Sequence, residues 1–566
     1  MSRDSDIAPP RTGLRRFSFA ILAGSTFLLL AMAWPALAQS DLAQAASPTP
    51  EPSLSTIAPT DTPAIPPPAT IAATSSSLGG LAQGSILLGL NAAGYQQLAW
   101  YQPGAAQLSG LSAGDWDDAQ PAASPSGGQL AFTSNRSGNW DLYLMELSSG
   151  QTNRLSDDAA YDGNPSWSPG GDWLAYEHDL GGNLEIFMRP LDASVDPVPL
   201  SNHAAADFEP AWRPGEQQIA FVSVRSGLAQ LWLLDLEHSG AQRFQLIAAS
   251  PRAQAAPAWS PDGRWLAWSE QEDLTWAIYL LDMSNPGAAR RLGAGHNPQW
   301  SPSGETVLAE LRDAQRSYLT GYDLDGGLAL APQPLPGPLN GLAWGPAALG
   351  ATLQAQAQPM APAASEAINP SAELSALDSV QAPSAQLSSA AEPAFDLLRQ
   401  RTAQLLGWDA LSSLDNAFVP LSGLLPPGRG QDWLYTGRAF ELHAALQPAG
   451  WLAAVREDFA GQTYWRVYLR TARQDGGLGL PLLAHPWDFT LGQPANEIPQ
   501  GYWIDFTALA AAHGFERPAA LDNWQRYYPG TLFSQFAYRQ GLSWEAAMLQ
   551  LYAADELAGL LASGSP

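Results

Sequence analysis

The stretch Trp259-Ser260-Pro261-Asp262-Gly263, followed by the apolar run Trp265-Leu266-Ala267-Trp268, indicates the fold class of this chain. Proline fixes φ and removes a backbone donor, and glycine adopts φ > 0 readily, so the Pro-Asp-Gly segment predicts a tight turn between two strands. A second apolar run at residues 278–282 predicts a third strand. Short apolar runs bounded by turn residues are typical of β-strands, so this stretch predicts a small antiparallel meander.

Related stretches recur along the chain at nearly constant spacing. The prolines at the turn are separated by 44, 45, 47, 41 and 44 residues. A period in this range is the size of one propeller blade, whose sheet buries both faces only by stacking on its neighbours. The sequence therefore predicts an all-β propeller. The anchor prolines are Pro125, Pro169, Pro214, Pro261, Pro302 and, in a looser copy, Pro346.

Tryptophans recur at one place in the repeat, shortly before the anchor proline. Recurrence in phase favours packing between blades over stacking on a ligand, because a ligand site would not need one tryptophan in every blade. We therefore interpret these side chains as part of the blade core. They are Trp167, Trp212, Trp259, Trp300 and Trp344.

The two ends of the repeat region are incomplete in complementary ways. Residues 85–112 carry strand-like runs without the anchor, and Trp344-Gly345-Pro346 is an anchor with little after it. Joined, they form one blade from both ends of the propeller and close a ring of about six blades, within the usual four to eight.

The stretch at residues 259–268 resembles the repeat of TolB-type propellers, and the resemblance covers about residues 85–350. The segments Ser134–Gly138 and Ser223–Gly227, between second and third strands, fit the same pattern. The resemblance implies a propeller at residues 85–352 that serves either as a binding platform or as the gate of a peptidase. Fold alone does not choose between these functions.

Composition and the N-terminal segment indicate an exported protein. A net charge of −27 excludes nucleic acid and anionic membrane surfaces as partners, and the absence of cysteine excludes disulfides and thiolate chemistry. Residues 1–38 combine arginines, a long apolar run and Ala36-Leu37-Ala38, as in a signal peptide or an uncleaved signal anchor. Residues 39–84, rich in Pro, Ser, Thr and Ala, predict a disordered tether. The body is therefore expected outside the cytoplasm.

A low-complexity linker at residues 353–392 precedes a region of different character, residues 393–566. Helical spacing predicts a helix over 395–406, stopped by Gly407, and alternation predicts a half-buried strand over 464–470. Two further helices are expected at 506–513 and 543–552. These elements predict a separate α+β domain.

Two motifs of this region, residues 433–442 and 514–527, resemble VanY-type D-alanyl-D-alanine carboxypeptidases. Carried over residue by residue, the zinc ligands of that family fall on Leu434, Glu441 and Gln525, and its general base falls on Asp522. Leucine cannot ligate zinc and glutamine is a weak neutral donor, so the resemblance implies a pseudoenzyme without a cofactor. The alternative interpretation is an ordinary turn at residues 435–438 and an ordinary core tryptophan.

We expect the surviving residues of those motifs to be able to bind a wall peptide. Arginine offers a bidentate fork to a carboxylate. The binding candidates are Tyr435, Arg438, Glu441, Asp522, Trp524 and Gln525.

Two functional hypotheses follow. The favoured one is a non-catalytic envelope protein whose propeller binds a protein or a glycan and whose peptidase-like region is inactive. The alternative is a zinc hydrolase with the propeller as gate and a rearranged site at Glu441, His443 and His485, a weak metal signal. The acidic loops of the propeller, such as Asp157-Asp158, are expected to cap turn amides, and no calcium loop is expected.

Overall fold

The structure, a computed structural model, describes residues 84–557 except 93, 104–106, 193–194, 273–274, 361–371, 424 and 555–556. The expected signal sequence and nearly all of the expected tether lie outside these residues. The segment Ala72–Pro566 forms one compact unit. Within the described ranges, no helix is both long and apolar enough to cross a membrane.

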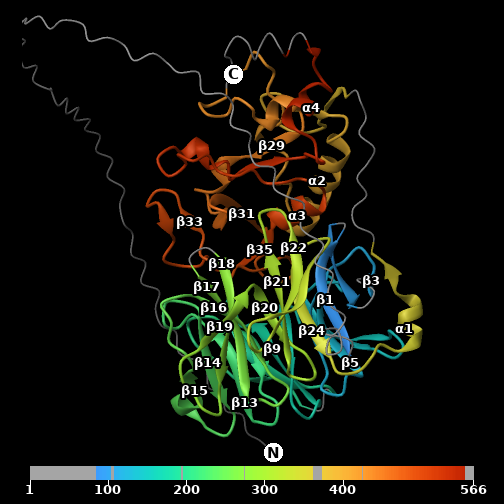
Figure 1. The fold of residues 1–566 in the computed structure, drawn as a ribbon, viewed down its shortest axis with the longest axis vertical. Coiled ribbons are helices and arrows are strands. Elements are labelled where there is room, and N and C mark those ends of the chain that lie inside the picture. The colour runs from blue at the N-terminus through green and yellow to red at the C-terminus, as the bar shows by residue number, and fades with distance from the viewer. Residues whose placement is uncertain are drawn as a thin grey trace, which may run out of the picture. The chain divides into compact units, whose positions relative to one another are not determined.

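Six antiparallel sheets of the described residues form the predicted propeller (Figure 1). In blades 1 to 5 a turn at the anchor proline joins an inner strand to a second strand, as in the hydrogen bond from Gly263 N to Ser260 O. Blade 1 holds β4 (Asp118–Ala123), β5 (Gln129–Ser134), β6 (Asp141–Glu146) and β7 (Thr152–Arg154); blade 2 holds β8 (Asp162–Trp167), β9 (Trp173–Asp179), β10 (Leu184–Pro190) and β11 (Val198–Pro199). Blade 3 holds β12 (Asp207–Trp212), β13 (Gln218–Ser223), β14 (Gln230–Asp235) and β15 (Phe244–Leu246), and η1 (Gly240–Arg243) lies between β14 and β15. Blade 4 holds β16 (Gln254–Trp259), β17 (Trp265–Glu272), β18 (Thr275–Asp282) and β19 (Arg290–Ala294); blade 5 holds β20 (His296–Trp300), β21 (Thr306–Arg312), β22 (Ser317–Asp323) and β23 (Leu328–Pro334).

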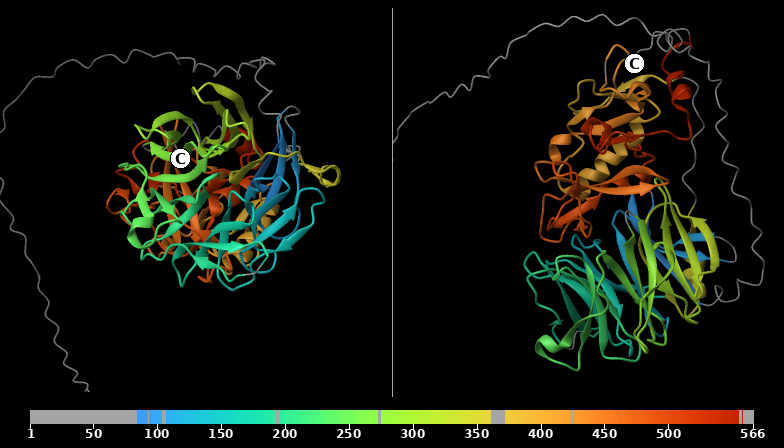
Figure 2. Two further views of the ribbon diagram at one scale, coloured as in Figure 1. Left: turned by 90° about the horizontal axis from the view of Figure 1, so that it is seen from below. Right: turned by 60° about the vertical axis from the view of Figure 1, so that its left-hand side comes forward.

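Blade 6 closes the ring with strands from both ends of the propeller. β24 (Leu339–Gly345) pairs with β1 (Ser85–Ala92), which pairs in turn with β2 (Tyr95–Gln102) and β3 (Gln107–Gly110). Ile86 lies opposite Trp344 in this register. Both views of Figure 2 show the blue and the yellow strands of this blade side by side. The predicted closure is confirmed.

The five recurring tryptophans are all buried and lie between neighbouring blades. Three of them also donate an indole hydrogen bond to the preceding blade: Trp167 to Ala122 O (2.8 Å), Trp259 to Ala211 O (3.0 Å) and Trp300 to Ala258 O (3.0 Å). These three tryptophans therefore contribute both apolar area and one satisfied polar group to the blade interface.

The expected linker differs from the prediction, because its described part is structured. α1 (Ala351–Gln356) follows the propeller, and β25 (Gln358–Pro359) adds a fifth strand to blade 6 beside β3. β26 (Leu374–Ala376) and β27 (Gln386–Ser388) form a hairpin. Even an Ala/Gln/Ser-rich segment supplies backbone groups that an open sheet edge can pair.

The C-terminal region contains both helices and strands, as predicted. α2 (Glu392–Leu406) ends at Gly407 with φ 73°, and β31 (Gln462–Arg470) pairs with β30 (Leu452–Phe459) and β35 (Tyr502–Asp505). α3 (Phe506–Ala512) matches its prediction, and α4 (Trp544–Met548) is shorter than predicted. The shorter elements are β28 (Leu414–Asn416), η2 (Trp433–Thr436), β29 (Ala439–Leu442), η3 (Ala444–Leu446), β32 (Leu480–Pro481), β33 (Trp487–Asp488), β34 (Gln493–Pro494), η4 (Tyr528–Thr531) and β36 (Gln535–Ala537).

A separate C-terminal domain is not shown, since the region shares one compact unit with the propeller. Polar and apolar contacts both join the C-terminal region to the propeller: Tyr502 packs into a hydrophobic cluster of the propeller, and Arg401 supplies the polar contacts. Arg401 of α2 binds Asp117 of the propeller through two bonds of 2.7 and 2.8 Å, and its Nε donates to Gly94 O (2.8 Å). Leaving these buried groups unpaired would cost stability, so the two regions hold each other in place.

Candidate binding cavity

A cavity of about 1610 Å³ is lined by the inner strands of all six blades and by the C-terminal region. The inner strands β4, β8, β12, β16, β20 and β24 line it along their length, up to the anchor prolines. From the C-terminal region, β30, β31 and residues 480–485 contribute to the wall. The cavity exceeds the usual volume of a small-molecule site, about 300–1,000 Å³, so it can take an extended ligand.

Each inner strand contains a bulge at one repeating position. The residue there has a positive φ and, in blades 1 to 5, is followed by a proline. The ladder with the second strand shifts register at this point, as between Phe208 and Ala211. A bulge re-aims the backbone, and here it turns an amide away from its own sheet. The six residues, with φ, are Gln120 (51°), Asn164 (50°), Glu209 (53°), Ala256 (50°), Asn297 (55°) and Gly341 (113°).

The amides freed by the bulges bind side chains of the preceding blade. Asn164 N donates to Gln120 Oε1 (2.9 Å), and Glu209 N donates to Glu177 Oε1 (2.7 Å). Ala256 N donates to Glu209 Oε2 (2.5 Å), and Asn297 N donates to Ser269 Oγ (3.1 Å). The cavity wall is thus a chain of polar side chains that connects one blade to the next.

Glu177 and Glu209 are the two carboxylates of this wall that have no basic partner. Burial raises the pKa of both, and the nearby Glu177 charge adds to the effect on Glu209, whose pKa rises from 4.5 to about 7. Glu177 is fully hydrogen bonded, by Tyr161, Asn164 and the Glu209 amide. Glu209 uses only Oε2, so its Oε1 is free to accept a hydrogen bond from a ligand.

The arginines around the cavity are already paired. Arg312 binds Glu310 (2.7 Å), and Arg466 of the C-terminal region binds Asp505 (2.5 Å). Burial and then the Arg312 charge lower the pKa of His296 to about 3, so this lining imidazole is neutral. The unmatched charge in the cavity is therefore the negative charge of Glu177 and Glu209.

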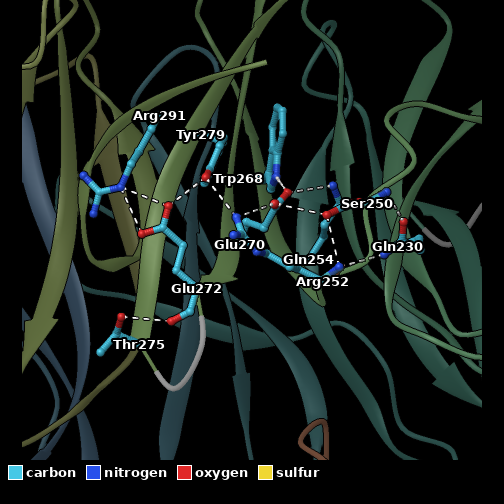
Figure 3. Close-up of polar contacts among 10 residues, drawn as sticks. All are labelled: Gln230, Ser250, Arg252, Gln254, Trp268, Glu270, Glu272, Thr275, Tyr279 and Arg291. Atoms are coloured by element: carbon cyan, nitrogen blue, oxygen red, sulfur yellow. Dashed lines mark hydrogen bonds and ion pairs between the residues drawn. The ribbon is translucent and has the colours of Figure 1, made fainter. Parts of the chain in front are cut away.

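A polar network holds the wall between blades 3 and 4 (Figure 3). Glu270 accepts from Gln254 Nε2 (3.1 Å), Trp268 Nε1 (3.3 Å) and Ser250 Oγ (3.1 Å). Glu272 accepts from Tyr279 OH (2.7 Å) and Arg291 Nε (3.0 Å). Glu270 also lies 3.8 Å from Arg252, so both carboxylates have a basic partner, in contrast to Glu209. The remaining labelled residues are Gln230, Arg252 and Thr275.

The structure places the binding candidates predicted from the second resemblance outside this cavity, and it uses most of them in the fold. Tyr435 is buried and its hydroxyl donates to Gly423 O (3.2 Å). Arg438 is buried and donates to Tyr538 O and Gln550 Oε1 (both 2.9 Å). Trp524 is buried against Trp465, with ring centroids 5.2 Å apart, whereas Asp522 and Gln525 are exposed.

The three weak metal candidates are not brought together. Glu441 is buried and paired with Arg429 (2.7 Å) and Asn416, whereas His443 is exposed and paired with Asp415 (2.5 Å). His485 lines the cavity, and its Nδ1 contacts Ala495 O at 2.9 Å. Glu441 and His443, two residues apart, would share a face if both lay on one strand, but β29 ends at Leu442 and His443 begins a turn.

The sequence did carry a signal for the cavity wall that the repeat analysis missed. A second proline precedes the anchor proline by four residues in blades 1 to 5. It marks the residue before it as the bulge, since a proline cannot donate to the sheet ladder. These prolines are Pro121, Pro165, Pro210, Pro257 and Pro298, and all line the cavity.

A family model described as the TolB beta propeller domain matches residues 110–199 and 193–348. No curated protein sequence matches the chain. Solved structures similar to part of the chain include TolB from Acinetobacter baumannii (21% identity, 46% of this chain and 67% of that one, TM-score 0.42) and putative TolB from Agrobacterium tumefaciens (19%, 43% and 98%, 0.32). A puromycin-hydrolyzing peptidase from Mycobacterium tuberculosis is also similar (16%, 44% and 45%, 0.33).

The family match, together with the six sheets, confirms the TolB-type propeller. The resemblance to VanY-type carboxypeptidases is not supported by these comparisons. Leu434, at the position of the first ligand, lies in a hydrophobic core with Tyr435 and Ala439. The comparisons do not distinguish a binding protein from an enzyme.

Proposed function

We propose that this chain is an exported, non-catalytic envelope protein that binds a basic peptide segment of a protein partner in the cavity. The observation that carries the proposal is the free carboxylate oxygen of Glu209, beside Glu177, in a cavity wall where only these two carboxylates of the described residues lack a basic partner. TolB-like propellers suggest protein interaction in general. The N-terminal signal and tether predicted from the sequence support a location outside the cytoplasm.

The two carboxylates without a basic partner favour a positively charged ligand. The carboxylates of Glu177 and Glu209 lie near enough for one to raise the pKa of the other. A lysine side chain or a peptide amino group entering the cavity would stabilise both ionised forms. The protein's net charge of −27 also attracts a cationic segment during encounter.

The cavity lacks the pairings on which acyl-transfer chemistry depends, in the residues the structure describes. Of the lining serines, Ser166 Oγ accepts from Trp212 N (2.9 Å), and Ser124 Oγ contacts Ser126 Oγ (3.2 Å). A nucleophilic serine requires a base such as histidine within hydrogen-bond reach. The cavity serines therefore do not support a serine hydrolase, and the zinc-hydrolase alternative is not favoured because Glu441, His443 and His485 each have a different partner and are not brought together.

Peptide binding tests the proposal. A fluorescein-labelled Ala/Ser peptide with one central lysine is compared by fluorescence anisotropy with the same peptide carrying norleucine, which has nearly the same shape without the charge. We expect the norleucine peptide to bind at least 10-fold more weakly, and Glu209→Gln to weaken binding of the lysine peptide by a similar factor.

Glu272→Gln is the matched control, since this carboxylate is already bonded to Tyr279 and Arg291 and is not part of the cavity lining. It should leave peptide affinity unchanged. Equal affinity for the lysine and norleucine peptides, or no saturable binding of either, would overturn the proposal.

A further inference from the structure

A second site lies between blades 1 and 2, at the start of an inner strand. Asp158, Asp162 and His178 place one ligand atom each within 4.8 Å of the others. Asp162 is the first residue of β8, His178 lies opposite it on β9, and Asp158 belongs to the exposed loop that leads into β8. Solvent can therefore reach the cluster through Asp158.

Two buried carboxylate oxygens at this site lack a hydrogen-bond partner. They are Oδ2 of Asp162 and Oδ1 of Asp141, and both residues have 0% exposure. The other oxygens are used: Asp162 Oδ1 contacts His178 Nδ1 (2.7 Å), and Asp141 Oδ2 accepts from Arg154 (2.7 Å). Buried anionic oxygens without a donor are costly, and a bound cation removes that cost.

Blades 1 and 3 have an arginine that this site lacks. At the same position, Asp118 of blade 1 binds Arg136 and Asp207 of blade 3 binds Arg225, each at 2.6 Å. Asp207 also keeps one oxygen unpartnered, but that arginine matches its charge, as Arg154 matches the charge of Asp141, whereas Asp162 has no arginine partner among the described residues.

Blade 2 departs from this pattern at two positions. The serine opposite the aspartate, Ser134 or Ser223, is replaced by His178, and the arginine two residues later is replaced by Leu180, which is 47% exposed. Compared with blades 1 and 3, blade 2 therefore lacks the arginine charge at this position and has instead an imidazole and the carboxylate of Asp158.

We propose that Asp158, Asp162 and His178 bind a Zn²⁺ ion, with the Asp141 carboxylate as a nearby buried charge. Zinc takes imidazole nitrogen and carboxylate oxygen as ligands. The ion replaces the proton shared by His178 Nδ1 and Asp162 and supplies the positive charge that arginine supplies in blades 1 and 3. This mixed set of donors fits zinc better than Ca²⁺, which takes oxygen ligands.

The test uses the full chain with ZnCl₂. After exposure to zinc and desalting, elemental mass spectrometry should find about one equivalent per chain, and calorimetric titration should give a single site. The double variant His178→Ser, Leu180→Arg rebuilds the pattern of blades 1 and 3. We expect it to fold, to bind zinc at least 100-fold more weakly, and to lose the zinc-dependent rise in Tm.

The control is His238→Ala, which removes an exposed histidine paired with Asp235 at 3.2 Å. It should retain zinc. Asp162→Asn should lose zinc, but it can also unfold the blade, so the double variant decides. A folded wild-type chain that retains no zinc, a double variant that retains as much as the wild type, or a preference for Ca²⁺ would each overturn the proposal.

Discussion

Arg401 and Arg399 lie two residues apart on α2 and show how strongly burial decides the value of an ion pair. Arg401 is buried, pairs with buried Asp117, and stacks 3.8 Å from the ring centre of Tyr95. Arg399 is part-buried, pairs with the part-exposed Asp409 at 2.8 Å, and donates to Asp378 O (2.6 Å) and Ser379 O (3.0 Å). Removing one partner of a buried pair costs about 3–5 kcal/mol, whereas an exposed pair is worth about 1 kcal/mol or less.

We therefore expect Arg401→Ala to lower the free energy of unfolding by about 3 kcal/mol and Arg399→Ala by a smaller amount, about 1–2 kcal/mol, since its ion pair is part-exposed and its two bonds to carbonyls are also lost. Urea titrations of both variants check this. Equal losses would show that Asp117 is not held by Arg401.

Glu209 predicts a pH dependence of stability. Its pKa in the folded state, about 7, lies above the ordinary 4.5, so the folded state binds the proton more tightly. Stability is therefore lost as pH rises from about 4.5 to about 7. Glu209→Gln removes this loss and should stabilise the protein at pH 8 by up to about 3 kcal/mol, since one pH unit of pKa difference is worth about 1.4 kcal/mol.

Denaturation at pH 5 and pH 8 measures the effect, and the gain at pH 5 should be much smaller. Glu272→Gln is the control of opposite sign. Although burial alone would raise it, bonds from Tyr279 and Arg291 lower the pKa of Glu272. Neutralising Glu272 should therefore destabilise the protein at pH 8. A Glu209→Gln variant without any pH-dependent gain would contradict the assignment of its raised pKa.

At the scale of one strand, the bulge requires a residue with a positive φ. Ala256 and Gly341 both adopt a positive φ, but at different conformational cost. Ala256 takes φ 50°, which is strained for a residue with a Cβ, whereas Gly341 takes φ 113°, where a Cβ would lie 2.7 Å from Gln120 Cα. We expect Ala256→Gly to stabilise the chain by about 0.5–1 kcal/mol and Gly341→Ala to destabilise it by more than about 1 kcal/mol. Thermal unfolding of both variants tests this, and shifts of the same sign would contradict it.

The strands also show which features of the fold and of the cavity could be predicted from the sequence. The Trp-Ser-Pro repeat predicts the blades and their closure because tight turns and blade packing are local requirements repeated at a fixed period. The wall of the cavity was predictable in principle from Pro210 and its counterparts. The pairing of Arg401 with Asp117 was not, because it joins residues 284 positions apart that no local pattern relates.

At the scale of the whole molecule, contacts of the C-terminal region with several blades predict how the protein unfolds. The Tyr502 hydroxyl donates to Asp179 of blade 2, and Arg517 Nε donates to Ala314 O of blade 5 (2.9 Å). Together with Arg401, they connect the C-terminal region to distant parts of the ring. We expect the wild-type chain to unfold in one transition, with coincident tryptophan fluorescence and far-ultraviolet circular dichroism.

The variant Tyr502→Phe, Arg517→Ala removes two of these contacts, and it also removes the ion pair of Arg517 with Glu457 inside the C-terminal region (2.6 Å). It should separate the unfolding into two transitions, because the C-terminal region can then open before the ring. Tyr528→Phe, Arg473→Ala is the control for the residue types, at exposed positions of the C-terminal region instead of the buried positions of Tyr502 and Arg517. It should keep a single transition. If the interface variant also unfolds in one step with an unchanged midpoint, these contacts do not couple the two regions, and the cavity wall contributed by β30 and β31 would then rest on Arg401 and apolar packing.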